Sequence, residues 1–201
     1  MIISIAGRSG SGKTTTVKKL LEILGEDNVC YLHQDSYYKD QSHIPYENRE
    51  LINYDHPDSI DIELFISHLK DLADNKKVKK PIYDFISHTR NNKTEIVYPK
   101  SIILADGIHV MTSLSIRKIV DIKVFVDTDA DISFIRRLLR DTKERDRSVE
   151  GVINQYIETV KPMQEKYIVP TRKYADFIIM EGGYNMPAIE KLVEMIRAKL
   201  K

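Results

Sequence analysis

The chain has 201 residues, a formal net charge of +1 and an apolar fraction of 42%. This length suits one domain with a substantial core, and the near-neutral charge excludes a bulk preference for nucleic acid or anionic membranes. The single cysteine, Cys30, cannot form an internal disulfide, and the apolar run at residues 2–6 is too short for a signal sequence or a membrane span. We therefore expect one cytoplasmic domain, residues 1–201.

The chain begins with a pattern typical of phosphate binding. A buried strand is expected over residues 2–6 and a helix over 15–24, and residues 7–14 between them read G-R-S-G-S-G-K-T, a P-loop. Glycine N–H groups can surround an anion, and the helix N-terminus that follows is positive. Lys13 is expected on the β- and γ-phosphates and Thr14 on Mg²⁺. The predicted nucleotide-binding residues of this loop are Gly7, Ser9, Gly10, Ser11, Gly12, Lys13, Thr14 and Thr15.

A second strand is expected at residues 29–32, and a long polar segment, 33–57, follows it. Asp35 comes just after this strand, at the edge of an open α/β sheet where ligands bind. A kinase needs a carboxylate beside the acceptor hydroxyl, and Asp35 is the best-placed candidate for this base, although it fits an ordinary turn equally well. Residues 53–58 contain groups that suit ribose hydroxyls, but the local pattern favours an Asx-turn.

The remaining elements alternate between helix and strand. Further buried strands are predicted at 101–105, 122–126 and 177–180. Helices are predicted from a cap at Asp58 or Ser59 to about residue 74, and over 112–119, 129–144, 148–160 and 186–200. Two β-prone runs, 78–85 and 94–98, flank a polar connection at 87–93 and predict a hairpin outside the main sheet. This order predicts an α/β fold with a central parallel sheet of about five strands.

Asp106 directly follows the apolar run that ends at Ala105. An acidic residue at the end of a strand beside a P-loop is the usual partner of Mg²⁺, so Asp106 fits a Walker-B-like role. Gly107 is expected to let a substrate approach closely. The alternative is a turn or helix-cap aspartate.

The segment 131–147 is rich in arginine. It contains Arg136, Arg137, Arg140, Arg145 and Arg147. The first three lie within one quadrant of a helix, and Ile132, Ile135 and Leu139 form a neighbouring apolar stripe that is expected to pack. Guanidinium groups match phosphate oxygens, so we expect a cationic lid over the phosphates. A solvated face with internal salt bridges is the alternative.

As a set, the motifs resemble those of the uridine kinase (uridine–cytidine kinase) family over about residues 2–190. They are the P-loop, Q-D-S-Y-Y at 34–38, Y-D-H-P at 54–57, P-I-Y-D-F at 81–85 with His88 and Arg90, F-V-D-T-D-A-D at 125–131, Arg136-Arg137 with Arg140-Asp141, Gln155-Tyr156, Lys161-Pro162 and Tyr174-Ala175-Asp176. The resemblance implies a three-layer P-loop NTPase fold, a nucleoside-binding hairpin at about 77–99 and a lid at about 137–160.

The resemblance also implies an activity, the transfer of a phosphoryl group from ATP or GTP to the 5′-hydroxyl of uridine or cytidine, with Mg²⁺. Asp35 would be the general base, assisted by Lys13 and Arg140, and Arg140 and Arg145 would contact the donor. The implied substrate-binding residues are Asp35, Tyr38, Asp55, Tyr83, His88, Arg137, Arg147 and Gln155. The implied metal ligands are Thr14, Asp106 and Asp35. Family members are commonly tetramers, so a homo-oligomer is expected, with no nucleic-acid or membrane partner.

The chain departs from the family pattern at three positions. Asp106 replaces a glutamate, Asp146 replaces a lid glycine, and Arg8 occupies a P-loop position that is commonly small. A kinase with another acceptor, of the phosphoribulokinase or pantothenate kinase type, is one alternative. A nucleotide-dependent regulator without catalysis is the other, although the Asn-Lys-x-Asp motif of GTPase switches is missing from the sequence.

Overall fold

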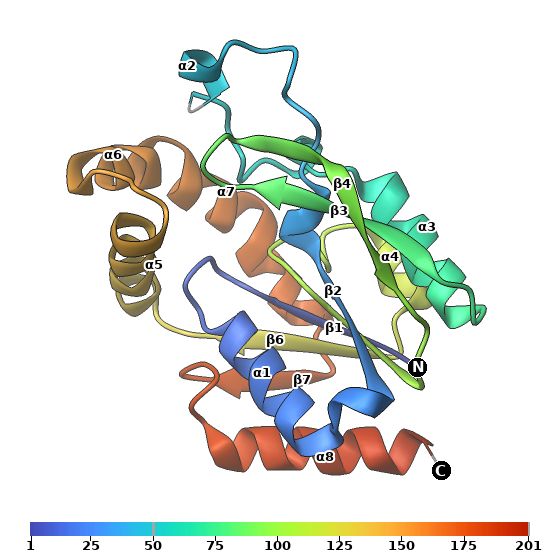
Figure 1. Ribbon diagram of the computed structural model, residues 1–201. Helices are drawn as coiled ribbons and strands as arrows, with labels where there is room; N and C mark the ends of the chain where they lie inside the picture. The colour runs from blue at the N-terminus through green and yellow to red at the C-terminus, as the bar shows by residue number, and fades with distance from the viewer. Residues whose placement is uncertain (50, 201) are drawn as a thin grey trace.

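The computed structural model describes residues 1–49 and 51–200, so Glu50 and Lys201 of the predicted domain lie outside the described residues. A five-stranded sheet with strand order β2-β5-β1-β6-β7 forms its centre (Figure 1), and every pairing in it is parallel. The strands are β1 (Ile2–Gly7), β2 (Val29–His33), β5 (Ile102–Asp106), β6 (Ile122–Asp127) and β7 (Phe177–Met180). The predicted α/β fold and its five strands are confirmed.

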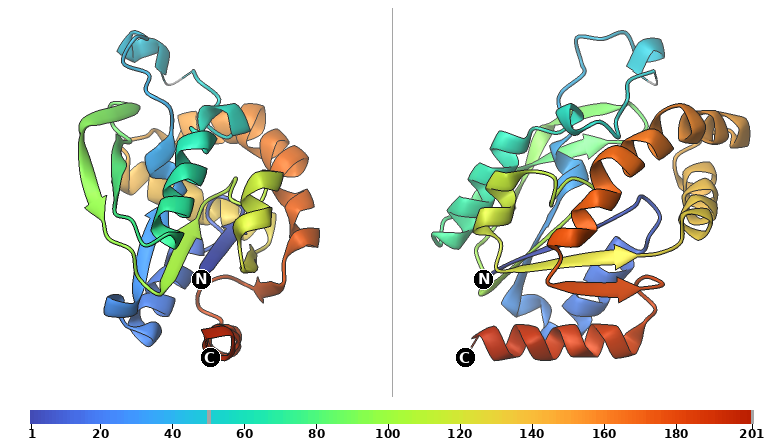
Figure 2. Two further views of the ribbon diagram at one scale, coloured as in Figure 1. Left: turned by 90° about the vertical axis from the view of Figure 1, so that its right-hand side faces the viewer. Right: turned by 180° about the vertical axis from the view of Figure 1, so that it is seen from behind.

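Helices cover both faces of this sheet (Figure 2), because alternate side chains of each strand point in opposite directions. Ile3 and Ile5 of β1 belong to one apolar core and Ile2 and Ala6 to the other. The first core includes α1 (Lys13–Leu24) and α8 (Met186–Leu200), and the second includes α3 (Ile62–Ala73) and α4 (Leu114–Ile119). The result is the predicted three-layer arrangement.

The parallel register brings the ends of the strands to one edge. His33 at the end of β2 is opposite Asp106 at the end of β5, and Gly7 at the end of β1 is opposite Val126 of β6. The P-loop, the segment that contains Asp35 and the end of β5 therefore meet at the same edge of the sheet.

The hairpin is a separate antiparallel pair, β3 (Val78–Asp84) with β4 (Thr89–Val97). The prediction of a hairpin outside the main sheet is confirmed, but its predicted connection at 87–93 is wrong. The turn comes earlier, because Asp84 accepts hydrogen bonds from the backbone N–H of Ile86 and the hydroxyl of Ser87, and His88 has a φ of +53°. Residues 89–93 belong to β4.

Two predicted helix boundaries are wrong. Helix α3 is capped by the side chain of Asp61, which accepts from the N–H of Leu64, because Pro57–Ser59 forms a separate 3₁₀ turn. A short helix, α2 (Tyr46–Arg49), lies in the polar segment before it. The helix predicted for 148–160 begins as α6 (Val149–Gln155), but helical backbone continues through α7 (Lys161–Met163) to Tyr174. Wide π-type turns surround Pro162, which has no N–H to donate.

Helix α5 (Ala130–Glu144) packs on the opposite side from the one predicted. Ile132, Ile135 and Leu139 of the predicted packing stripe are 40%, 49% and 51% exposed. The buried positions are Ser133, Arg137 and Asp141. A polar and charged stripe of α5 therefore faces the rest of the molecule. None of the helices in the described part of the chain is both long and apolar enough to span a bilayer.

Candidate active site

The P-loop joins β1 to α1 and packs against α5. Gly10 has a φ of +83°, and a Cβ there would lie 2.1 Å from the carbonyl oxygen of Ser133, so only glycine fits between the loop and the helix. Gly12, with a φ of +99°, precedes the first turn of α1. The ammonium of Lys13 donates to the carbonyl oxygens of Gly7 and Arg8 at 3.1 and 2.9 Å. The loop thus holds its lysine at the carboxyl edge of the sheet.

Two cavities meet at this loop. The larger, of about 330 Å³, extends from the P-loop to the hairpin, and the smaller, of about 280 Å³, lies beside α1 and α5. Lys13, Thr14 and Arg140 line both cavities. The larger cavity is lined by Ser9, Lys13, Thr14, His33, Asp35, Tyr38, Tyr54, Asp55, Tyr83, Phe85, His88, Ile108, Arg137, Arg140, Asp141, Arg145, Arg147 and Gln155. The smaller is lined by Gly10, Gly12, Lys13, Thr14, Thr15, Arg136, Arg140 and Tyr184.

A histidine links the two predicted functional carboxylates. Nε2 of His33 lies 3.3 Å from Oδ2 of Asp35, and Nδ1 lies 2.6 Å from Oδ1 of Asp106. Tyr31 donates a hydrogen bond of 2.7 Å to the same Asp106 oxygen. Burial opposes protonation of His33, but the two carboxylates outweigh it and raise the pKa of His33 to about 10. Burial also opposes ionisation of Asp35, but His33 and Arg145 hold the pKa of this carboxyl well below its usual range.

Asp106 at the end of β5 and Thr14 in the first turn of α1 offer oxygen ligands suited to Mg²⁺. Asp106 is fully buried, and its Oδ2 has no hydrogen-bond partner among the described residues. A buried carboxylate oxygen and the Thr14 hydroxyl are hard donors of the kind that Mg²⁺ prefers, and donor phosphates and waters supply its remaining ligands. In residues 1–49 and 51–200, no cluster of three or more His, Cys, Asp or Glu side chains could hold a metal by itself. The residues therefore fit a metal bound together with a nucleotide.

The far end of the larger cavity is aromatic. Tyr38, 8% exposed, packs against Tyr54 and Tyr83 with ring centroids 5.5 and 5.0 Å away. His88 stacks on Tyr54 at 5.7 Å with an interplanar angle of 24°. Arg90 of β4 donates to the carbonyl oxygens of Tyr37 and Tyr38 and so ties the hairpin to the segment after β2. Such a surface suits a flat ring with polar edges.

Asp55 occupies the middle of the larger cavity. Asn53 accepts a hydrogen bond from the Asp55 N–H, which is the predicted Asx-turn, and yet Tyr54 and Asp55 both line the cavity. The Asp55 carboxylate lies 3.6 Å from the guanidinium of Arg137. Burial raises the pKa of Asp55, although Arg137 acts in the opposite direction. A carboxylate in this position can accept hydrogen bonds from hydroxyl groups of a ligand.

Three arginines of the lid segment (residues 137–160) surround the carboxylate of Asp141. Its carboxylate lies 3.3 Å from Arg137, 2.8 Å from Arg140 and 3.4 Å from Arg145. Arg137 also donates to Gln155, and Arg140 reaches the Ser9 hydroxyl at 3.5 Å. One buried carboxylate therefore holds together three cations that face the cavities, which is the arrangement expected of an anion site.

The structure brings nearly all predicted site residues together. The eight predicted substrate-binding residues and the three predicted catalytic residues line the larger cavity. Of the predicted P-loop contacts, Gly7 and Ser11 line neither cavity, and Asp106 is buried behind His33. Asp146 of the lid segment has a φ of +53°, a left-handed conformation that aspartate tolerates better than most residues. Arg8 extends toward Asp127, 4.0 Å away.

The expectation for Gly107 is wrong, and several site residues were missed. A Cβ at Gly107 would lie 2.4 Å from the side chain of Gln34, so this glycine makes room for a packed side chain and not for a ligand. The cavity residues outside the predicted sets are His33, Tyr54, Phe85, Ile108 and Asp141 in the larger cavity and Arg136 and Tyr184 in the smaller one. Tyr54, Phe85, Arg136 and Asp141 belonged to motifs that could have indicated them, whereas His33, Ile108 and Tyr184 did not.

The chain is similar over nearly its whole length to proteins named uridine kinase. The chain is 50% identical over 197 residues to a protein named uridine kinase from Clostridium tetani, with 98% of this chain and 94% of that one covered. It is 50% identical over 196 residues to a uridine kinase from Staphylococcus haemolyticus, with 98% and 95% covered.

Solved structures share the fold at low identity. A phosphoribulokinase from Rhodobacter spheroides matches with a TM-score of 0.65 at 16% identity and covers 89% of this chain and 69% of that one. A "Possible Uridine Kinase" from Bacillus stearothermophilus matches with a TM-score of 0.59 at 22% identity, with 89% and 88% covered. The model of the Phosphoribulokinase / Uridine kinase family matches residues 2–186, and the chain therefore belongs to that family.

Proposed function

We propose that the protein is a uridine/cytidine kinase of pyrimidine salvage, which transfers the γ-phosphate of ATP or GTP to the 5′-hydroxyl of uridine or cytidine. One observation carries the proposal: the cavity beside α1 and α5 and the larger, partly aromatic cavity share Lys13, Thr14 and Arg140. A donor in the smaller cavity and a nucleoside in the larger one would thus meet at these three side chains. The uridine kinases that resemble the chain over nearly its whole length support this choice of acceptor.

The catalytic steps follow from the positions of the residues. Asp35, which is ionised over the physiological range, accepts a hydrogen bond from the 5′-hydroxyl and receives its proton as the oxygen attacks. Lys13 and Arg140 stabilise charge on the transferred phosphoryl group. Thr14 and Asp106 would hold Mg²⁺, which supplies charge neutralisation at the donor phosphates. Arg137, Arg145, Arg147 and Gln155 line the cavity from the lid segment, where a closed lid excludes water as a competing acceptor.

The nucleoside would be held from the hairpin side. Asp55 accepts from ribose hydroxyls, Tyr38 and Tyr83 pack against the pyrimidine, and His88 contacts its polar edge. The expectations of a single kinase domain over residues 1–201, a cytoplasmic location and a tetrameric assembly belong to the same proposal. The first two rest on length and composition, and the third rests on resemblance to the family.

The proposal is tested by incubating the purified protein with Mg·ATP or Mg·GTP and a panel of acceptors, with product identification by mass spectrometry. The panel contains uridine, cytidine, a purine nucleoside, ribulose 5-phosphate and pantothenate. We expect multiple turnovers that yield UMP or CMP and a nucleoside diphosphate. Phosphorylation of the sugar phosphate or of pantothenate would show that the acceptor is not a pyrimidine nucleoside. The absence of turnover with any acceptor would favour a nucleotide-binding regulator.

A further inference from the structure

His33 is a cavity residue for which the kinase chemistry described above has no role. It ends β2 directly opposite Asp106, and its side chain is 29% exposed on the cavity side. The Asp106 carboxylate behind it is fully buried. The imidazole therefore stands between a carboxylate fixed within the sheet and a carboxylate at the surface of the cavity.

Each nitrogen of the imidazole faces a different carboxylate. Nδ1 is 2.6 Å from Asp106 and Nε2 is 3.3 Å from Asp35. An ionised carboxylate accepts hydrogen bonds, so each ring nitrogen is placed to face an acceptor oxygen. The Asp106 end is rigid, because Tyr31 donates to the same carboxylate oxygen and the register of two paired strands fixes the backbone. The Asp35 end follows the strand and lies in a short 3₁₀ turn.

We propose that His33 is a positioning residue, which holds the Asp35 carboxylate toward the acceptor hydroxyl and is itself fixed by Asp106 and Tyr31. This inference rests on the proposed function, since it gives Asp35 the role of base. A misplaced base costs turnover far more than it costs binding, because near-attack geometry requires the reacting groups within about 3–3.5 Å of each other. Loss of His33 should therefore lower kcat and leave the KM for ATP nearly unchanged.

Two amide substitutions separate this role from simple support of Asp106. In His33→Asn the amide nitrogen takes the place of Nδ1 and can donate only toward Asp106. In His33→Gln it takes the place of Nε2 and can donate toward Asp35. We expect His33→Asn to lower kcat about tenfold or more and His33→Gln to retain most of it. The reverse order would show that His33 only supports Asp106 and would overturn the proposal.

A double-mutant cycle supplies the second test. If His33 acts through Asp35, then His33→Asn should change kcat by less than about twofold once Asp35→Asn is present, because no base remains to position. If the double variant instead shows the product of the two single-variant losses in kcat, the proposal is contradicted. Thermal unfolding and equilibrium binding of Mg·ATP, measured on every variant, show that the fold and donor site persist. A wild-type enzyme without nucleoside kinase activity would refute the proposed function. If the wild type is active and the His33→Asn variant has the same kcat, this inference alone is refuted.

Discussion

The guanidinium of Arg145 lies over the ring of Phe85, 4.0 Å from its centroid. Arg145 follows α5 in the lid segment, and Phe85 lies in the hairpin turn, so this pair joins the two parts that enclose the larger cavity. A cation over an aromatic face contributes about 0.5–2 kcal/mol, depending on its exposure. The contact therefore favours the arrangement in which lid and hairpin are close together.

Replacing Phe85 by leucine should weaken nucleoside binding. The variant keeps an apolar side chain but loses the ring face, so the closed arrangement is less populated and the apparent affinity falls with it. We expect the KM for uridine to rise about two- to tenfold with a smaller change in kcat. Steady-state kinetics test this, with the exposed neighbour substitution Ile86→Val as the control. An unchanged KM for uridine in Phe85→Leu would show that the contact does not contribute to closure.

Asp35→Asn should lower kcat by about 10²-fold or more, because an amide cannot accept the proton of the 5′-hydroxyl. Binding of ATP should be largely unaffected, since the P-loop contacts remain. Single-turnover phosphorylation of uridine and calorimetric titration with Mg·ATP measure the two effects separately. The exposed Asp27→Asn serves as the charge-matched control. Wild-type turnover in Asp35→Asn would remove this residue from the role of base.

Asp146 carries a negative charge in the lid segment, between two arginines that line the larger cavity. Its φ of +53° suits glycine or asparagine as well as aspartate. Asp146→Gly and Asp146→Asn should both lower the KM for ATP, by about two- to fivefold, because each removes the same exposed charge near the phosphates. The gain should shrink at high salt. A lower KM in the glycine variant alone would assign the effect to backbone freedom instead of charge.

The elements fixed by local pattern were predictable from the sequence. The five strands follow from continuous apolar runs, and the meeting of the P-loop with Asp35 follows from the rule that parallel strands end at one edge. The exposure of the apolar stripe of α5 was not predictable in this way. An amphipathic helix is expected to bury its apolar face, but α5 lies over a polar cavity and turns Arg137 and Asp141 inward.

His33 and Gly107 show a second kind of limit. His33 is a strand-end residue whose partner is 73 positions away, so no local spacing connects it with Asp106. Gly107 follows a predicted metal ligand, which suggested room for a substrate, but the space is filled by Gln34 of another segment. Both features depend on which side chains the sheet register brings together, and that information is not contained in either segment alone.

His109, by contrast, leads to a prediction about stability. The residue is fully buried, its Nε2 lies 2.9 Å from the carbonyl oxygen of Asp55, and Nδ1 has no hydrogen-bond partner among residues 1–49 and 51–200. Burial lowers the pKa of His109 to about 4 from the ordinary value of 6.5. The neutral ring is thus the folded form, and it connects the loop after β5 with the segment that carries Asp55.

The sign of the effect follows from proton binding. Below pH 6.5 the unfolded chain takes up a proton at His109 that the folded chain does not bind, so the free energy of unfolding should fall as the pH drops toward 4. The loss amounts to at most about 3 kcal/mol, because each pKa unit corresponds to about 1.4 kcal/mol.

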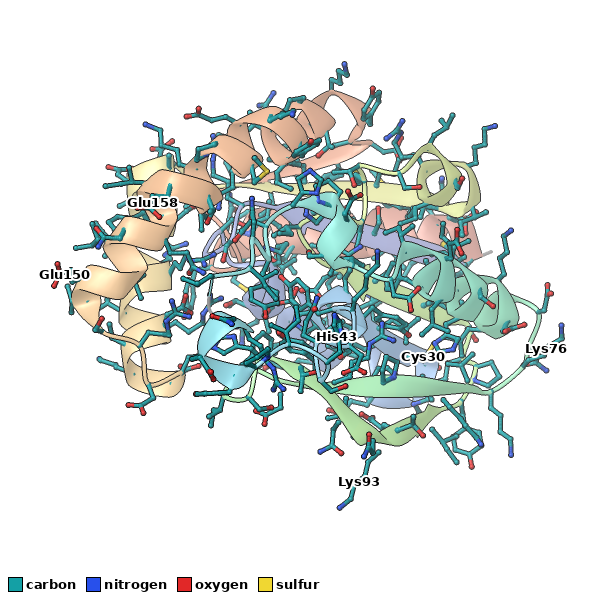
Figure 3. All side chains as sticks on the ribbon, turned by 90° about the horizontal axis from the view of Figure 1, so that it is seen from above. Cys30, His43, Lys76, Lys93, Glu150 and Glu158 are labelled. Atoms are coloured by element: carbon teal, nitrogen blue, oxygen red, sulfur yellow. The ribbon has the colours of Figure 1, made fainter. Side chains whose placement is uncertain are left out.

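His109→Gln keeps a donor for the Asp55 carbonyl but cannot titrate, so its unfolding free energy should lack this component. Urea unfolding between pH 4 and pH 8 measures the difference between the two proteins, in which the shared carboxylate titrations cancel. His43→Gln changes an exposed histidine, which is labelled in Figure 3, and is the matched control. A His109→Gln protein that loses stability in acid as steeply as the wild type would show that His109 is not the residue responsible.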